Sequence, residues 1–198
     1  MDLESAVENL QEIRHQLSRT STFTGYRPLF LGSIAILAFV IALAQGVLGA
    51  ARTMEAAYAE WMGIALLIVV LTVIFVFVPS LRSRYVVIRS LAFGVARQFT
   101  PFVVAGTAGT LIAYQLAPVL VTFLPATWCA LFGLSIFSMQ PYLPRAVAMS
   151  GIWYLGISLA LAVWPPATVT GLAAGMGLAF AGGHAITAII MRATLRLR

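Results

Sequence analysis

The side chains able to perform acid–base chemistry are few in this chain of 198 residues, which has six carboxylates, two histidines and one cysteine. The carboxylates all lie outside the long apolar runs, at Asp2, Glu4, Glu8, Glu12, Glu55 and Glu60. An enzyme or a proton-coupled transporter in a membrane usually needs an ionisable residue within the bilayer. This distribution predicts no paired-carboxylate site, so we expect no catalytic residue and no enzyme.

His184 falls inside the last apolar run, roughly two helical turns from its end. It has three interpretations: a neutral imidazole bonded to its neighbours, a proton carrier or gate residue, and an axial ligand to haem or a metal. His184 is therefore the candidate for cofactor binding. His15 is too distant to complete a zinc motif, and Cys129 alone makes neither an intrachain disulfide nor a cysteine cluster. We expect no metal site and no cofactor, with haem as the alternative.

The composition indicates the environment of the chain. It is 61% hydrophobic and 9% charged, with a mean hydropathy of +0.98, whereas soluble domains carry about 25% charged residues. The net charge of +6 comes from arginines beside apolar runs rather than from one basic patch, so nucleic acid is not an expected partner. These values predict an all-α integral membrane protein whose first partner is the lipid bilayer.

Six apolar runs are long enough to cross a bilayer, which needs roughly 20 residues in a helix. We expect them to pair into three hairpins. The segment 102–140 carries no charge and is divided near Leu124 and Pro125, although Pro118 is an alternative break. The expected spans are 29–50, 61–78, 101–121, 126–140, 146–163 and 168–191.

The arginines predict the orientation of these spans, because cytoplasmic loops carry an excess of basic residues. With a cytoplasmic N-terminus, 11 of the 12 arginines fall on the cytoplasmic side and only Arg52 on the other. The eleven are Arg14, Arg19, Arg27, Arg82, Arg84, Arg89, Arg97, Arg145, Arg192, Arg196 and Arg198. We expect six spans in the inner (plasma) membrane, with both termini in the cytoplasm.

The first 20 residues differ from the rest of the chain, because their apolar residues recur at spacings of three and four. This is the pattern of one stripe on an amphipathic helix. The stripe consists of Leu3, Ala6, Leu10, Ile13 and Leu17. We therefore divide the chain into an amphipathic cytoplasmic helix with its linker at 1–25 and a six-helix transmembrane bundle at 26–198.

The stretch from Glu12 to Thr20, EIRHQLSRT, is followed by Phe23 and Thr24 just before the first apolar run. This opening resembles the start of a group of small bacterial membrane proteins of unassigned activity, whose genes often lie near winged-helix transcription regulators. The match covers about the first 25 residues. The resemblance implies a short polar N-terminal helix followed by several spans, and it supplies no site residues.

The last expected span carries a small residue every four positions. Such a ridge lets two helix backbones approach closely, whereas bulky apolar residues suit a helix face against lipid. The ridge consists of Gly171, Gly175, Ala179, Gly183 and Thr187. It predicts packing within the bundle; contact in a homodimer and close approach to a ligand are the alternatives.

A second pattern is a polar stripe on the third and fourth expected spans, made of Thr107, Thr110, Tyr114, Gln115, Ser135 and Ser138. It either lines a polar path or supplies hydrogen bonds between helices. The tryptophans mostly lie near span ends, as in an aromatic belt, although Trp153 lies deeper. The arginines of the second connection orient the chain or bind lipid headgroups: Arg82, Arg84, Arg89 and Arg97.

The leading hypothesis is a non-enzymatic membrane scaffold or regulatory protein. Its N-terminal helix, residues 1–20, engages a cytosolic protein or the protein's own cytoplasmic surface. The first alternative is a small transporter or channel with a polar path near the third, fourth and sixth spans. The second alternative is a haem- or metal-binding membrane protein that uses His184.

Overall fold

The computed structural model describes residues 23, 26–116 and 118–196, and its regular structure is helical throughout that part of the chain. Six segments are long and apolar enough to cross a membrane, which confirms the expected number of spans. They are Pro28–Gly46, Met54–Leu81, Val86–Leu116, Val119–Ser138, Arg145–Val163 and Val169–Thr194. The expected N-terminal helix lies outside the described residues.

The first two spans start on local signals that the sequence carries. Helix α2 (Pro28–Gly46) begins with a proline, which needs no hydrogen-bonded N–H in a first turn. Helix α3 (Met54–Thr72) is capped by the Thr53 hydroxyl, which accepts from the N–H of Ala56 at 3.2 Å. It continues through a π turn (Val73–Phe77) into α4 (Val78–Leu81), so the second span starts earlier than the expected residue 61.

Helix α5 (Val86–Leu116) carries Pro101 in its interior, so the prediction that the third span starts at residue 101 is wrong. A proline removes one backbone hydrogen bond, and the neighbouring Thr100 hydroxyl donates to the Ala96 carbonyl at 2.8 Å. The 31 residues form one helix of about 46 Å, which exceeds the roughly 30 Å of bilayer hydrocarbon. The helix ends before Pro118, the alternative break, and not at 121.

The remaining spans are interrupted by short irregular turns. A 3₁₀ turn (Pro118–Phe123) precedes α6 (Leu124–Ser138), and two further 3₁₀ turns (Gln140–Tyr142 and Arg145–Val147) lead into α7. The last two spans consist of α7 (Ala148–Val163), α8 (Val169–Gly177), a π turn (Leu178–Gly182) and α9 (Gly183–Arg196). The sixth span is therefore one helical rod with a wider turn in its middle.

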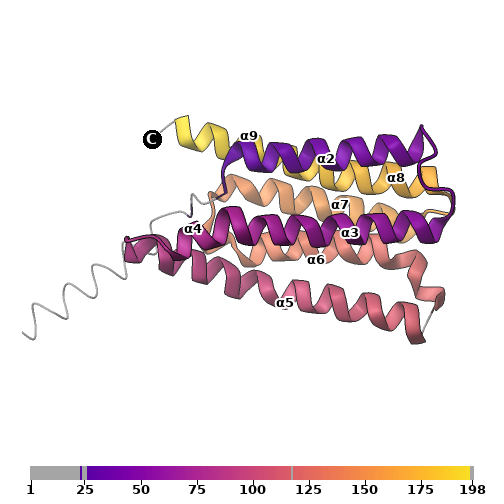
Figure 1. Ribbon diagram of the computed structural model, residues 1–198, viewed down its shortest axis with the longest axis horizontal. Coiled ribbons are helices and arrows are strands. Elements are labelled where there is room, and N and C mark those ends of the chain that lie inside the picture. The colour runs from indigo at the N-terminus through magenta and orange to yellow at the C-terminus, as the bar shows by residue number, and fades with distance from the viewer. Residues whose placement is uncertain (1–22, 24–25, 117, 197–198) are drawn as a thin grey trace, which may run out of the picture.

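The helices lie side by side along the long axis of the molecule, and the turn between α4 and α5 projects beyond the others (Figure 1). The most extensive packing joins α6 to α7 and α2 to α8 and α9. Helix α2 therefore packs mainly on the sixth span, not on its neighbour in sequence. Helices α3 and α5 leave most of their surface exposed, since 17% and 11% of the residues in their most apolar windows are buried.

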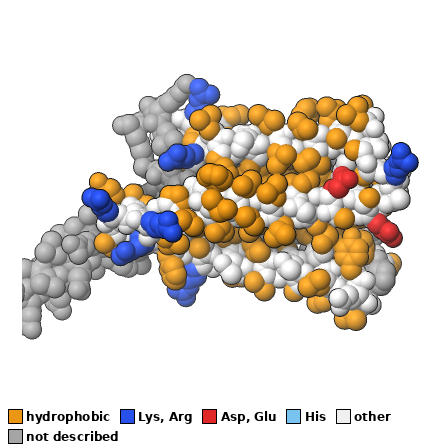
Figure 2. All heavy atoms as spheres, in the orientation of Figure 1, with side chains coloured by type: hydrophobic (Ala, Val, Ile, Leu, Met, Phe, Trp, Pro, Cys, Tyr) orange, Lys and Arg blue, Asp and Glu red, His pale blue; other side chains and the backbone are white. Residues whose placement is uncertain are grey.

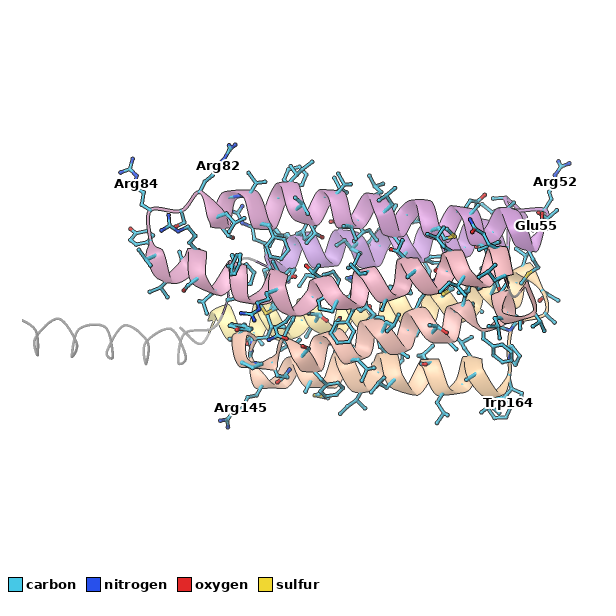
Figure 3. All side chains as sticks on the ribbon, turned by 90° about the horizontal axis from the view of Figure 1, so that it is seen from below. Arg52, Glu55, Arg82, Arg84, Arg145 and Trp164 are labelled. Atoms are coloured by element: carbon cyan, nitrogen blue, oxygen red, sulfur yellow. The ribbon has the colours of Figure 1, made fainter. Side chains whose placement is uncertain are left out.

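Charged residues separate between the two ends of the bundle. Arg82, Arg84 and Arg145 lie at one end, and Arg52 and Glu55 lie at the other (Figure 3). The space-filling view shows basic side chains gathered at the first end and the visible acidic ones near the second, with apolar side chains between (Figure 2). We call these the arginine end and the glutamate end; the chain leaves the last helix, α9, at the arginine end.

Candidate functional site

His184 lies on the sixth span in contact with Tyr154 of α7, and both side chains are buried. The Tyr154 hydroxyl is 2.8 Å from Nδ1 of His184, and the same nitrogen is 2.9 Å from the Phe180 carbonyl. A neutral imidazole nitrogen is either a donor or an acceptor. Nδ1 therefore either donates to the carbonyl or accepts from the tyrosine, and both states keep the ring uncharged.

Aromatic rings enclose this pair. Phe132 of α6 lies 5.5 Å from the His184 ring and 4.8 Å from the Tyr154 ring, measured between centroids. Phe180 adds a second ring at 6.2 Å from His184. The surroundings are apolar apart from the hydrogen bonds just described, which is the arrangement that the packing interpretation of His184 expects.

A π turn beside His184 leaves a backbone carbonyl of the sixth span able to accept a hydrogen bond from a second α7 side chain, Trp153. Such turns leave carbonyls without their usual helical partner and are frequent at functional sites. The Trp153 indole donates to the Leu178 carbonyl at 2.9 Å. A Cβ on Gly182 would lie 2.9 Å from the Trp153 ring, so the glycine is what allows the indole to approach.

The small-residue ridge faces α7 of the same chain over most of its length. A Cβ on Gly175 would lie 2.6 Å from Cδ2 of Leu161, and one on Gly183 would overlap the Tyr154 ring. Farther along, the Thr187 hydroxyl is 2.8 Å from the Ser150 hydroxyl. Ala179 is fully buried, whereas Gly171 is exposed in the first turn of α8. The ridge is thus a contact surface between two spans.

The polar stripe divides into separate hydrogen bonds. Thr110 of α5 accepts from the Trp128 indole at 2.9 Å and donates to the Gly106 carbonyl at 2.7 Å. Ser138 donates to Gln98 at 2.8 Å, and Ser135 donates to the carbonyl of Phe132, three residues back. These bonds tie α5 to α6 and satisfy the α6 backbone.

The other members of the stripe do not join these bonds. Thr107, Tyr114 and Gln115 are exposed on α5. The six residues therefore do not converge on one path in the structure. Among the described residues, no three His, Cys, Asp or Glu side chains come together as metal ligands, and Cys129 is buried.

The arginines of the second connection point away from the bundle. Arg82 and Arg84 lie at the tip of the α4–α5 turn (Figure 3). Arg89 and Arg97 are exposed on the first half of α5, beside the exposed apolar residues Val86 and Phe93. This part of α5 presents both positive charge and apolar surface at the arginine end.

Phe23 anchors the chain at the arginine end and was not identified from the sequence. Its side chain is 1% exposed, and its N–H donates to the Tyr142 carbonyl at 2.6 Å. Its ring packs on Phe77 and on Tyr26, with centroids 6.4 and 5.5 Å apart. Burial raises the pKa of Tyr26 above its usual value. The available sequence signal was a pair of aromatic residues, Phe23 and Tyr26, in the polar stretch before the first span.

A second group of side chains, which the sequence pattern does not predict, joins α2 to α3 at the glutamate end. Gln45, 2% exposed, donates from Nε2 to the Glu60 carboxylate at 2.6 Å, and its Oε1 accepts from the Trp61 indole at 2.9 Å. Glu60 was expected in a connection and Trp61 in an aromatic belt. The available signal was Gln45 itself, a polar residue inside an apolar run.

The buried polar groups of the spans therefore bond mainly to one another, across helix contacts or to nearby carbonyls.

No protein-family model, curated protein or solved structure matches the chain. What the arrangement offers chemically is a set of fixed helix contacts, one buried tyrosine–histidine pair and two ends of opposite charge character. Each is a property of side chains described above.

Proposed function

We propose that this protein is a non-enzymatic scaffold or regulatory protein of a bacterial inner membrane. In this proposal consecutive spans follow one another as three hairpins, with the first span, α2, packed mainly on the sixth. An amphipathic helix within residues 1–25 engages a cytosolic protein partner. The observation that carries the proposal is the anchoring of Phe23, which is buried and hydrogen-bonded to Tyr142. Phe23 itself is fixed at the arginine end, and we propose that the segment before it acts there.

The packing of the spans favours a scaffold over transport. A transporter needs a polar path that can admit water or a solute. Here Thr110 is engaged by Trp128, Ser138 by Gln98, and Thr187 by Ser150. These bonds hold helices together and leave those hydroxyls committed to protein partners.

The proposed orientation places the arginine end in the cytoplasm, following the excess of basic residues in cytoplasmic loops. Arg82, Arg84 and Arg145 gather there, opposite Arg52 (Figure 3). With Cys129 replaced by serine, a cysteine at Ala56 should react with an impermeant thiol reagent in intact cells, and one at Ser83 should not. Labelling at Ser83 and protection at Ala56 would reverse the orientation.

The partner proposal is tested by photo-crosslinking in intact cells, with a photoreactive amino acid at Leu10 of the amphipathic stripe. We expect a discrete adduct with a second protein. The matched control carries the same group at Leu66, which is 67% exposed on α3 and should give lipid adducts only. Replacing Leu3 and Leu17 with serine should abolish the Leu10 adduct, because the apolar face is then interrupted.

The outcome at Leu10 separates the hypotheses. An adduct with the chain's own bundle would show that the helix covers the protein's own surface, and the partner proposal would be wrong. A chain that begins at Phe23 should still insert with six spans, because the anchor, Arg27 and the later arginines remain. Loss of insertion would make the N-terminal helix part of the fold itself.

A further inference from the structure

A groove runs along the outside of the bundle between α2 and α3. It has a volume of about 330 Å³ and is open to the surroundings of the bundle. Its lining is apolar except for one carboxylate, and consists of Ile41, Ala44, Glu60, Gly63, Ile64 and Leu67. Gly63 keeps the groove open, since a Cβ built there would meet nothing within 4 Å.

The Glu60 carboxylate in this groove is held in place by a hydrogen bond from a buried side chain. The Gln45 amide donates to Oε2 of Glu60 at 2.6 Å and is itself fixed by the Trp61 indole at 2.9 Å. Gln45 is buried, so its amide has no solvent to exchange with. Oε1 of Glu60 receives no hydrogen bond from the described residues and remains able to accept one from a molecule in the groove.

The depth of Glu60 matches the boundary between headgroups and hydrocarbon. It lies six residues after the first residue of α3, about 9 Å along the helix axis. The span Met54–Leu81 has 28 residues and is about 42 Å long, so it extends past about 30 Å of hydrocarbon at its ends. Glu60 therefore falls near the edge of the apolar layer, with the apolar part of the groove leading inward.

We propose that this groove binds phosphatidylethanolamine from the leaflet at the glutamate end. The primary ammonium has three N–H donors and a positive charge, and it donates to Oε1 of Glu60. The acyl chain lies along Ile41, Ile64 and Leu67. A lipid is the occupant because the groove opens on the surface that six membrane spans present to the bilayer. The proposal does not depend on the cytosolic partner.

The test uses the purified full-length chain, titrated in detergent with phosphatidylethanolamine, phosphatidylcholine or phosphatidylglycerol and examined by native mass spectrometry. We expect one phosphatidylethanolamine to bind more tightly than the other two lipids, because choline has no N–H to donate and glycerol has no positive charge. Glu60→Gln should weaken that binding about tenfold, the equivalent of one charge-assisted hydrogen bond. Glu55→Gln, at the same end but outside the groove, should leave it unchanged.

A second variant tests the groove without touching the carboxylate. Gly63→Leu should fill the open space and weaken phosphatidylethanolamine binding, while Gly156→Leu, also at an open glycine but on α7, should not. Melting curves for all four variants verify that each is folded. Equal binding of the three lipids, or an equal loss in Glu55→Gln and Glu60→Gln, would overturn the proposal.

Discussion

The contact between α7 and the sixth span differs from the flank formed by α3 in how each uses small and polar residues. In the sixth span, 39% of the residues in the most apolar window are buried, against 17% in the α3–α4 span. Both are apolar enough to cross a membrane, and the more exposed α3–α4 span is also the more apolar of the two. Lipid is as apolar as leucine, and close packing and hydrogen bonds decide which face meets protein.

Two glycines show this difference directly. Gly183 lies under the Tyr154 ring, which occupies the space that a Cβ would need, whereas Gly63 on α3 has nothing within 4 Å of such a Cβ. The first glycine permits a helix contact, and the second leaves an open groove. The same residue type therefore has opposite consequences on the two sides of the molecule.

The largest expected effect is that of Gly183→Leu. Its side chain overlaps the buried Tyr154 ring, so α7 and the sixth span must separate, and we expect a loss of about 3 kcal/mol in the free energy of unfolding. The matched variant Gly63→Leu should unfold like the wild type. The measurement is thermal or denaturant unfolding in detergent. Equal melting of the two variants would remove the distinction between the two regions.

Gly175→Ala should cost less than Gly183→Ala, although both positions lie on the ridge. The added Cβ at Gly175 meets the end of the Leu161 side chain, which can rotate away, whereas the one at Gly183 meets a rigid aromatic ring. Melting temperatures in the same detergent measure the order. The reverse order would mean that the α7 contact is tighter near α8 than near α9.

The next effect concerns the tyrosine–histidine pair. His184→Leu leaves the buried Tyr154 hydroxyl without its partner and should cost about 1–3 kcal/mol. His184→Asn keeps a donor and an acceptor close to the backbone and should cost less. Unfolding of both variants, each combined with Tyr154→Phe, gives the coupling energy between the two side chains. A coupling near zero for Leu would mean that the 2.8 Å contact contributes nothing.

Thr187→Val is expected to have a smaller effect. It removes the hydrogen bond to Ser150 while keeping the shape of the side chain. Hydrogen bonds between membrane helices contribute about 0.6 kcal/mol on average. A matched change at exposed Thr107 on α5 should have no measurable effect. Equal losses at the two positions would show that the loss at Thr187 does not come from its hydrogen bond to Ser150.

Much of the architecture could be predicted from the sequence, and the reason is local. A run of apolar residues long enough to cross a bilayer needs no knowledge of its neighbours, so the six spans are correct in number. The small residues of the sixth span likewise predict a contact face without reference to the helix that it contacts. Helix boundaries were less predictable, because the helix continues through Pro101 and packs Leu91 and Val95 into the core.

The partners across helices could not be predicted. His184 was identified from its position, but Tyr154 as its partner depends on how α7 and the sixth span are rotated against each other. Gln45 and Glu60 lie 15 residues apart on either side of a turn, and their contact depends on the register of α2 on α3. Such pairings are set by the packing of whole helices, which no local pattern contains.

The smallest expected effect has the opposite sign and compares two buried tyrosines. Tyr154 has a hydrogen-bonded hydroxyl, whereas the buried hydroxyl of Tyr58 on α3 has no partner among the described residues. Removing an unpaired buried hydroxyl relieves a desolvation cost. Tyr58→Phe should therefore leave the stability unchanged or raise it by up to about 1 kcal/mol. Its ring keeps the edge-on contact with Trp128, at 6.3 Å between centroids.

Tyr154→Phe is the control for this change and should lower the melting temperature, because it breaks the bond to His184. The two variants remove the same atom from buried rings, so their difference isolates the effect of the hydrogen bond. A loss in Tyr58→Phe as large as that in Tyr154→Phe would mean that the α3 flank holds its polar groups as firmly as the α7 contact. The difference between the α7 contact and the α3 flank would then depend only on their glycines, Gly183 and Gly63.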